Sequence, residues 1–219
     1  MNILAVDTST PQVTAGIVRD GETVAEQLHL DARAHNEVLV PLIQQCLPDS
    51  GMAATELDAV VVGCGPGPFT GLRVGMATAA SFADALGIPC YGICSLDALA
   101  SGAGSARDEL VVTDARRREV YFAAYRDGQR VFGPAVAKPA DVMELLKEEV
   151  AAEVASFAPS HARGSLNHIE QIAGLEVAAE QVFPTPKAMV ETAHFDSAPG
   201  PLVPLYLRRP DAVVPKAMR

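Results

Sequence analysis

Residues 58–75 read DAVVVGCGPGPFTGLRVG, an apolar run followed by a loop rich in glycine and proline. The run from Asp58 to Val62 is typical of a buried strand. Residues 76–86 favour a helix and stop before Gly87, a residue suited to end one. The sequence therefore predicts a strand, a loop and a helix in succession. Such a unit often presents the N-terminus of its helix to an anion, so phosphate binding is the first function to consider.

Counting residues excludes the two common phosphate-binding motifs. A P-loop needs a Gly-Lys pair, which this loop lacks. In the dinucleotide-binding fingerprint, counted from Gly63 or from Gly65, the third glycine is replaced by Pro68 or Thr70. Pro66 and Pro68 also remove two backbone N–H donors. We therefore expect the loop to stiffen the chain rather than to hold a phosphate.

Small residues line one face of the predicted helix. Gly71, Gly75, Ala79 and Ala83 recur at every fourth position, so another backbone can come close to this face. The bare face predicts close packing against a neighbour.

Arg73 lies in the first turn of this helix if Thr70 is its N-cap. A cation there opposes the helix dipole. Two interpretations stay open. The arginine is either solvated or paired locally, or it is held for an anion or for a carboxylate of a partner.

The composition is that of an acidic globular protein with a core of Ala, Val and Leu. The chain has 219 residues, 49% hydrophobic content, no Trp and a formal net charge of −10. A free-standing nucleic-acid binder is usually basic, so we expect contact with nucleic acid only through another subunit. Basic side chains cluster locally, first at Arg116, Arg117 and Arg118.

Cysteine spacing and the N-terminal residues bear on the compartment. The four cysteines lack zinc-site spacing, and no Lys or Arg precedes Arg19, so no signal peptide is visible. No segment reaches membrane-spanning length. We expect a reduced, cytoplasmic protein that binds no membrane.

The order of predicted elements suggests a duplicated α/β unit. Asp20-Gly21 and Asp127-Gly128 each join two strand-like runs. In the helical pattern of residues 38–47, Pro41 predicts a kink or a late start. A strand ending in Asp7 and another ending in Asp114 resemble the facing turns of the actin-like ATPase (ASKHA, RNase H-like) fold.

This fold class predicts two subdomains with mixed sheets flanked by helices. We place them at residues 1–104 and 105–219, because the boundary region is small, polar and flexible. We also expect the last helix to pack back on the first subdomain.

Five motifs together resemble the bacterial TsaB (YeaZ) family, which is related to TsaD. They are Asp7-Thr8-Ser9, residues 65–75, Ser95-Leu96-Asp97-Ala98-Leu99, residues 114–121 and Pro204-Leu205-Tyr206-Leu207-Arg208. The resemblance implies a role in making N6-threonylcarbamoyladenosine, next to the anticodon in tRNA. It also implies a subunit that does not catalyse the transfer, that dimerises with a TsaD-like catalytic subunit and that is joined by a TsaE-like ATPase.

The resemblance further implies an interface on two helices, at about residues 36–47 and 70–86. We expect the interface to contain His35, Leu39, Leu42, Ile43, Leu72, Arg73, Gly75, Met76, Ala79 and Ala83. An apolar surface of this kind predicts a homodimer when the partner is absent.

The residues predict a degenerate catalytic site. The catalytic relative holds a metal with a His-x-x-x-His pair, whereas here the position four after His35 is Leu39. We expect no catalytic residue and no metal. Asp7, Thr8 and Asp114 are the positions where we expect a nucleotide or another anion to bind, and to bind only weakly. ATP or ADP would bind either weakly in this way or at the partner interface. The two acids serve otherwise as turn or cap residues.

Three functional hypotheses follow. The first is a non-catalytic scaffold subunit of the threonylcarbamoyl transfer complex. The second is a free-standing ATPase or kinase of the same fold that uses Asp7 and Asp114. The third is a glycoprotease-like metallopeptidase, which only an older label of the family suggests.

Overall fold

The fold comes from a computed structural model, which describes residues 1–30, 35–101, 108–150, 157, 159, 161–164, 171–172 and 175–208. Its strands are β1 (Asn2–Asp7), β2 (Gln12–Arg19), β3 (Glu22–Leu30), β4 (Ala59–Gly63), β5 (Cys90–Ile93), β6 (Asp108–Asp114), β7 (Val120–Arg126), β8 (Gln129–Ala137), β9 (His161–Gly164) and β10 (Glu176–Gln181). Its helices are α1 (His35–Ser50), η1 (Ala54–Glu56), α2 (Phe69–Leu86), α3 (Ser95–Ser101), η2 (Pro139–Asp141), α4 (Val142–Val150) and α5 (Pro186–Thr192).

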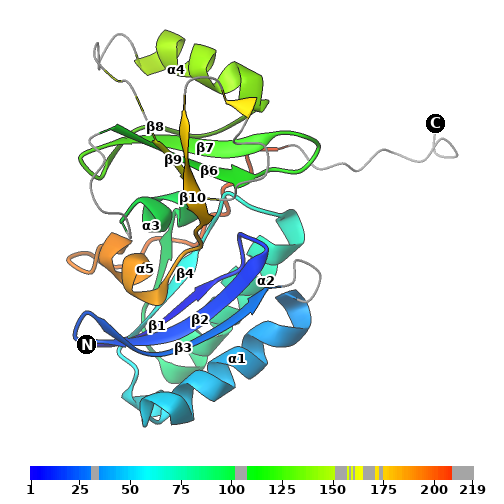
Figure 1. Ribbon diagram of the computed structural model, residues 1–219. Coiled ribbons are helices and arrows are strands. Elements are labelled where there is room, and N and C mark those ends of the chain that lie inside the picture. Colours follow the sequence, from blue (N-terminus) through cyan, green and yellow to red (C-terminus); the bar gives the residue numbers. More distant parts are fainter. Residues whose placement is uncertain are drawn as a thin grey trace, which may run out of the picture.

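The strands form two five-stranded mixed sheets with the same topology (Figure 1). The first has the order β3-β2-β1-β4-β5, and the second, read from the other edge, has the order β8-β7-β6-β9-β10. In each sheet three antiparallel strands are followed by two parallel ones. This repetition confirms the predicted duplicated α/β unit.

Two predicted hairpin turns are confirmed. Asp20 and Gly21 have φ of 51° and 85°, and Asp127 and Gly128 have φ of 50° and 76°. Turns of this type need positive φ at both central residues, which explains the Asp-Gly pair in each.

The helix of residues 69–86 ends as predicted but begins differently. Gly87 closes α2 in the left-handed conformation, with φ of 67°, and donates its N–H to the carbonyls of Ala83 and Asp84. The N-cap is Pro68 and not Thr70, so that prediction was wrong. Pro68 stays extended while its carbonyl accepts the first helical hydrogen bond, from Leu72 N at 3.0 Å. A loop that proline already holds extended needs no side-chain cap.

α1 begins at His35 and contains both Pro41 and Pro48. The alternative of a late start at Pro41 was therefore wrong. Pro41 is exposed, so its ring points away from the core. Within the described ranges, each helix falls short of the length and apolar character that crossing a bilayer requires.

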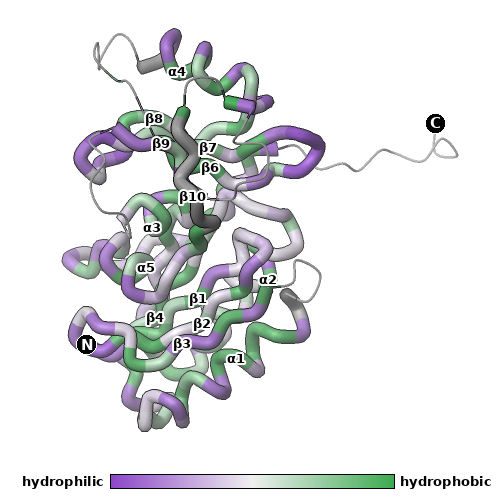
Figure 2. The backbone as a smooth tube through the Cα atoms, viewed as in Figure 1, coloured by the Kyte–Doolittle hydropathy of each residue, from purple (hydrophilic) through white to green (hydrophobic). Residues whose placement is uncertain are grey.

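Helices cover both faces of the first sheet (Figures 1 and 2). α1 and α2 bury Leu39, Ile43 and Leu72 against one face, beside Val60 and Val62. α5 and α3 cover the other face, where Met189 packs with Ile3 and Ala5. α4 packs on the second sheet. Leu96 and Leu99 of α3 also contact Val111 and Tyr125, so α3 lies between the two sheets.

The last helix returns to the first sheet. α5 places Pro186 directly over Gly16 of β2. Its N-cap is Thr185, whose hydroxyl accepts the N–H of Ala188 at 3.3 Å. The expected subdomain boundary between residues 104 and 105 lies outside the described residues, so the boundary stays a prediction. Most of the predicted strand near 154–157 and helix near 166–173 lies outside them as well.

Residues 197–208, which we call the C-terminal strap, connect the two halves. Leu205 donates its N–H to the carbonyl of Cys64 at 2.9 Å, in the first half. Arg208 donates to the carbonyl of Ala115 at 2.7 Å and pairs with Glu119 at 3.2 Å, in the second half. The strap is the last described segment, orange to red in Figure 1.

The packing of α5 predicts that Gly16→Ala destabilises the protein. A Cβ at position 16 would overlap the ring of Pro186 and the carbonyl of Ala25. We expect a loss of about 1–3 kcal/mol in the free energy of unfolding, the usual cost of overpacking. Urea unfolding measures it.

Gly200→Ala is the matched control, because a Cβ there meets no atom within 4 Å. Equal stability of the two variants would show that α5 does not pack on β2 as described.

Candidate functional site

The carboxylate of Asp7 is fully buried at the carboxyl end of β1. Its Oδ1 accepts hydrogen bonds from the N–H and the hydroxyl of Ser9, at 2.8 and 2.7 Å. Its Oδ2 accepts one from the hydroxyl of Ser95, at 2.6 Å. A buried carboxylate needs such donors, because its charge is otherwise costly to remove from water.

The glycine-proline loop closes over this acidic turn. A Cβ on Gly63 would overlap Oδ2 of Asp7, and a Cβ on Gly67 would overlap the carbonyl of Ser9. The carbonyl of Gly65 accepts the N–H of Ser95 at 2.8 Å. Gly63 and Gly67 are therefore required by close contact with the turn at residues 7–9, which this loop covers.

The bare face of α2 packs against the same turn. The hydroxyl of Thr8 donates to the carbonyl of Gly71 at 2.7 Å. A Cβ on Gly75 would overlap that hydroxyl. The close neighbour that the small residues predicted is thus a turn of this chain.

The two predicted anion-binding acids have structural roles. Asp7 and Thr8 have 0% exposure, and the Asp7 carboxylate already accepts three hydrogen bonds. Asp114 is half-buried and accepts the N–H of Arg116 at 2.7 Å. Both acids therefore act as turn and cap residues here, which favours that alternative over nucleotide binding.

Most residues predicted for the partner interface lie in the core of this chain. The buried ones are Leu39, Leu42, Ile43, Leu72, Gly75, Met76, Ala79 and Ala83. We correct the prediction for these eight residues, because a partner cannot reach them while the first sheet is covered. Arg73 is exposed, and the side chain of His35 lies outside the described residues.

The outer faces of the same two helices remain available. Val40 is 47% exposed on α1, and Ala77 is exposed on α2. Half-buried apolar side chains extend this surface, namely Val38, Leu47, Val74, Phe82 and Leu86. The outer faces of the two helices thus carry exposed and half-buried apolar side chains that were not among the residues predicted.

Arg73 is paired locally. Its guanidinium lies 3.8 Å from the centre of the Phe69 ring, and its Nε donates to the hydroxyl of Tyr206 at 3.0 Å. The Phe69 and Tyr206 rings lie 4.8 Å apart. Arg73 therefore fastens the C-terminal strap to α2, and a further role toward an anion or a partner stays a prediction.

The described residues offer no metal centre and no activated thiol. Among them, no three His, Cys, Asp or Glu side chains gather into a group that could hold a metal. Burial raises the pKa of Cys64 to about 12 and that of Cys46 to about 11. Thiols with raised pKa values remain protonated at neutral pH and are poor nucleophiles.

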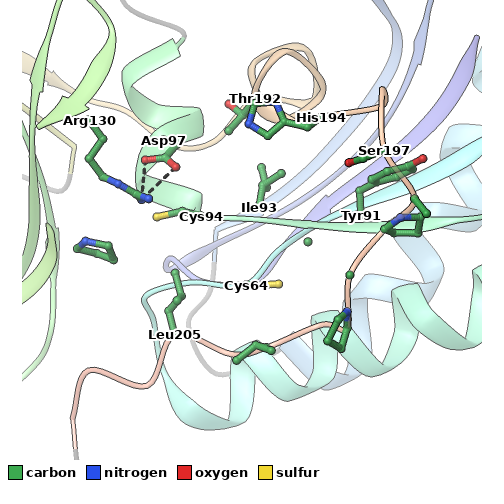
Figure 3. Close-up of a pocket in the computed structure, with 17 residues that line it drawn as sticks. Cys64, Tyr91, Ile93, Cys94, Asp97, Arg130, Thr192, His194, Ser197 and Leu205 are labelled. Carbon is green, nitrogen blue, oxygen red and sulfur yellow. Dashed lines mark hydrogen bonds and ion pairs between the residues drawn. The ribbon is translucent and has the colours of Figure 1, made fainter. Parts of the chain in front are cut away.

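A cavity of about 480 Å³ lies at the carboxyl ends of β4 and β5, and the sequence analysis did not predict it (Figure 3). Arg130 of β8 extends into it and donates to both oxygens of Asp97, at 3.0 and 3.1 Å. Asp97 also accepts the hydroxyl of Tyr125 at 2.7 Å. Four separate segments line the cavity, so no local motif could have revealed it. Both oxygens of Asp97 therefore accept hydrogen bonds from within this chain.

Comparison with known proteins agrees with this architecture. Residues 24–195 match the model of the family described as TsaD, tRNA N6-adenosine threonylcarbamoyltransferase. The tRNA threonylcarbamoyladenosine biosynthesis protein TsaB of Escherichia coli is 36% identical over 156 residues, which are 68% of this chain and 67% of that protein. An uncharacterized protein of Mycobacterium leprae is 52% identical over 215 residues, which are 96% of this chain. This chain therefore spans only 55% of the length of that protein.

A solved structure supports the fold. It is an uncharacterized Pseudomonas aeruginosa protein with similarity to peptidase YeaZ, with a TM-score of 0.75 and 24% identity, covering 94% of this chain and 99% of that one. The duplicated sheets and this likeness define a protein of the actin-like ATPase fold, in which the first acidic turn is sealed. The match to a family model and to TsaB identifies the chain more specifically than the fold does. The chain belongs to the TsaB (YeaZ) family of TsaD-related proteins.

The contact between α2 and the acidic turn predicts that Gly75→Ala destabilises the protein. Alanine would add up to about 1 kcal/mol of helix propensity, but its Cβ overlaps the Thr8 hydroxyl. We expect a net loss of about 1–3 kcal/mol in chemical unfolding.

A double-mutant cycle with Thr8→Ala isolates this contact. Removing the hydroxyl makes room for the new methyl group, so the two losses should be less than additive by about 1 kcal/mol. Strict additivity would show that Thr8 and Gly75 do not touch.

The raised thiol pKa predicts how Cys64 reacts with iodoacetamide. A thiol with a pKa of about 12 gains thiolate throughout the range from pH 8 to 11, whereas an ordinary thiol levels off above about pH 9. Mass spectrometry of the native protein should therefore show slow labelling that keeps rising with pH.

The same protein unfolded in guanidinium chloride is the control, and its Cys64 should label faster at pH 8 by about a hundredfold or more. Equal rates in the two states at pH 8 would contradict the burial of this thiol.

Proposed function

We propose that this chain is the non-catalytic scaffold subunit of a cytoplasmic complex that transfers a threonylcarbamoyl group to N6 of the adenosine next to the anticodon in tRNA. The sealed Asp7 carboxylate carries the proposal. Its hydrogen bonds to Ser9 and Ser95 and the cover at Gly63 leave no opening for a metal-bound phosphate. The E. coli relative bears the name of a tRNA threonylcarbamoyladenosine biosynthesis protein, which supports the pathway.

A scaffold subunit needs a surface for its partner. The exposed faces of α1 and α2 supply apolar area around Val40, Val74 and Phe82. We propose that a TsaD-like catalytic subunit covers this surface, because apolar patches rimmed by polar residues favour protein contacts. A TsaE-like ATPase joins the two subunits. ATP or ADP binds either weakly or at the interface between the subunits. The tRNA binds only through the assembled complex. In the absence of the partner, two copies cover the same surface.

Depletion of the protein tests the pathway. Bulk tRNA from depleted cells should contain less threonylcarbamoyladenosine. The measurement is quantification of the separated nucleosides by mass spectrometry. A plasmid copy should restore the nucleoside. Normal levels after depletion would contradict the proposed function, and ATP turnover by the isolated protein that Asp7→Ala abolishes would favour a free-standing ATPase instead.

A charge on the outer helix faces tests the surface. Val40→Asp and Ala77→Asp each place a carboxylate where we expect apolar contact. Each should weaken binding to the TsaD-like subunit by about tenfold or more, as measured by calorimetry, because the carboxylate would be buried without a partner.

Val24→Asp is the matched control, since Val24 is a 38% exposed valine on β3. It should leave the affinity unchanged. If all three variants bind like the natural chain, the partner contacts another surface.

A further inference from the structure

The cavity at the carboxyl ends of β4 and β5 has no part in the proposed function. Its volume of about 480 Å³ lies within the range of about 300–1,000 Å³ that is usual for small-molecule sites. β5 and the start of α3 line it from the first half, and Arg130 and Pro134 of β8 line it from the second. The C-terminal strap completes the wall, with Val203 and Leu205 among its lining residues. A molecule in this cavity would therefore contact both halves and the strap at once.

One end of the cavity carries a pair of opposite charges (Figure 3). Asp97 and Arg130 are the charged residues among those that line the cavity, where His194 is counted as neutral at pH 7. The side chains of the pair keep 25% and 35% of their surface exposed, and the two groups lie 3.0 Å apart. Their charges compensate each other, so the cavity has no net charge that would attract an ion.

Both members of the pair keep hydrogen-bonding capacity. Oδ1 of Asp97 accepts from Tyr125 and Arg130, at 2.7 and 3.0 Å. Among the described residues, Oδ2 accepts from Arg130 alone, at 3.1 Å, and a carboxylate oxygen can accept a second hydrogen bond. Nη1 of Arg130 serves Asp97, and the guanidinium also interacts with the thiol of Cys94. A guanidinium has more N–H groups than these contacts use. The pair therefore offers an acceptor and a donor side by side.

Apolar side chains line the cavity beside the charged pair. Ile93, Val203 and Leu205 contribute aliphatic groups, and Tyr91 contributes an aromatic ring (Figure 3). Three prolines also belong to the wall, and their fixed φ makes it stiff. Walls of this kind, with a few convergent polar groups, are typical of sites that orient a small organic molecule.

We propose that this cavity binds a small neutral molecule that carries a primary amide on an apolar body. The amide N–H donates to Oδ2 of Asp97 while the amide carbonyl accepts from the guanidinium of Arg130, so one group uses both capacities. The apolar body packs against Tyr91 and Ile93. The proposal does not depend on the proposed function.

The same geometry disfavours ions. A carboxylate at this place would accept from Arg130 but would lie beside the carboxylate of Asp97. An ammonium group would donate to Asp97 but would lie beside the guanidinium. Each ion meets a like charge at close range in a partly buried site, where repulsion is stronger than in water. The charged pair therefore selects for a neutral head group.

The probes benzamide, benzoate and benzylamine test this selection. They share one apolar ring, and their head groups are neutral, negative and positive at about pH 7. Each is titrated into the isotope-labelled natural chain, and the amide chemical shifts in NMR spectra give both the dissociation constant and the place of binding. Benzamide should shift the amides of residues 91–97 and of the strap, and it should bind about tenfold or more tightly than either ion.

Asp97→Asn tests the origin of the selection. The variant keeps the shape of the side chain and a carbonyl that can accept from Tyr125, but it leaves the charge of Arg130 uncompensated. Benzoate should therefore bind about tenfold more tightly to the variant than to the natural chain. A damaged fold would not produce such a gain. Asp84→Asn is the matched control, because it removes the same charge from an exposed position on α2, and it should leave all three affinities unchanged.

Three results would overturn the proposal. If benzoate or benzylamine binds the natural chain as tightly as benzamide, the charged pair does not select a neutral amide. If benzamide shifts no amide around the cavity up to millimolar concentration, the cavity is not its site. If a folded Asp97→Asn protein keeps the natural order of affinities, Asp97 does not set the selection. None of these results bears on the role in tRNA modification, and the comparison of probes on the natural chain decides even if the variant fails to fold.

Discussion

The buried carboxylate of Asp7 is the interaction around which the first half is arranged. Its oxygens take hydrogen bonds from the turn that follows β1 and from the first residue of α3. It therefore fixes the end of β1 relative to the start of α3. The space around the carboxylate also explains why Gly63 ends β4. Removing any of these donors would leave part of a charge unpaired in the interior, which is among the costlier defects a fold can carry.

Local patterns in the sequence predicted the elements well. The strand, loop and helix of residues 58–86, the two Asp-Gly hairpins and the duplicated unit all depend on neighbours along the chain. The predicted N-cap of α2 was wrong by two residues, because Pro68 already holds the chain extended and replaces the capping side chain that Thr70 was expected to supply.

Contacts between distant segments were harder to predict. The small residues of α2 correctly indicated a close neighbour, but nothing in their spacing says whether that neighbour is Thr8 or another protein. The cavity near Asp97 is assembled from four segments, and the role of Arg73 depends on Tyr206, 133 residues further along the chain. Such contacts are set by tertiary packing, which periodicity along one segment does not encode.

The C-terminal strap has a consequence for motion. Proteins built from two duplicated halves around a central helix commonly rotate one half against the other about a hinge. Here a single extended segment is bonded to Cys64 in one half and to Ala115 and Glu119 in the other. Rotation must stretch this segment or release one of its ends, so the strap sets a limit on the opening angle. The strap thereby acts as a tether between the two halves.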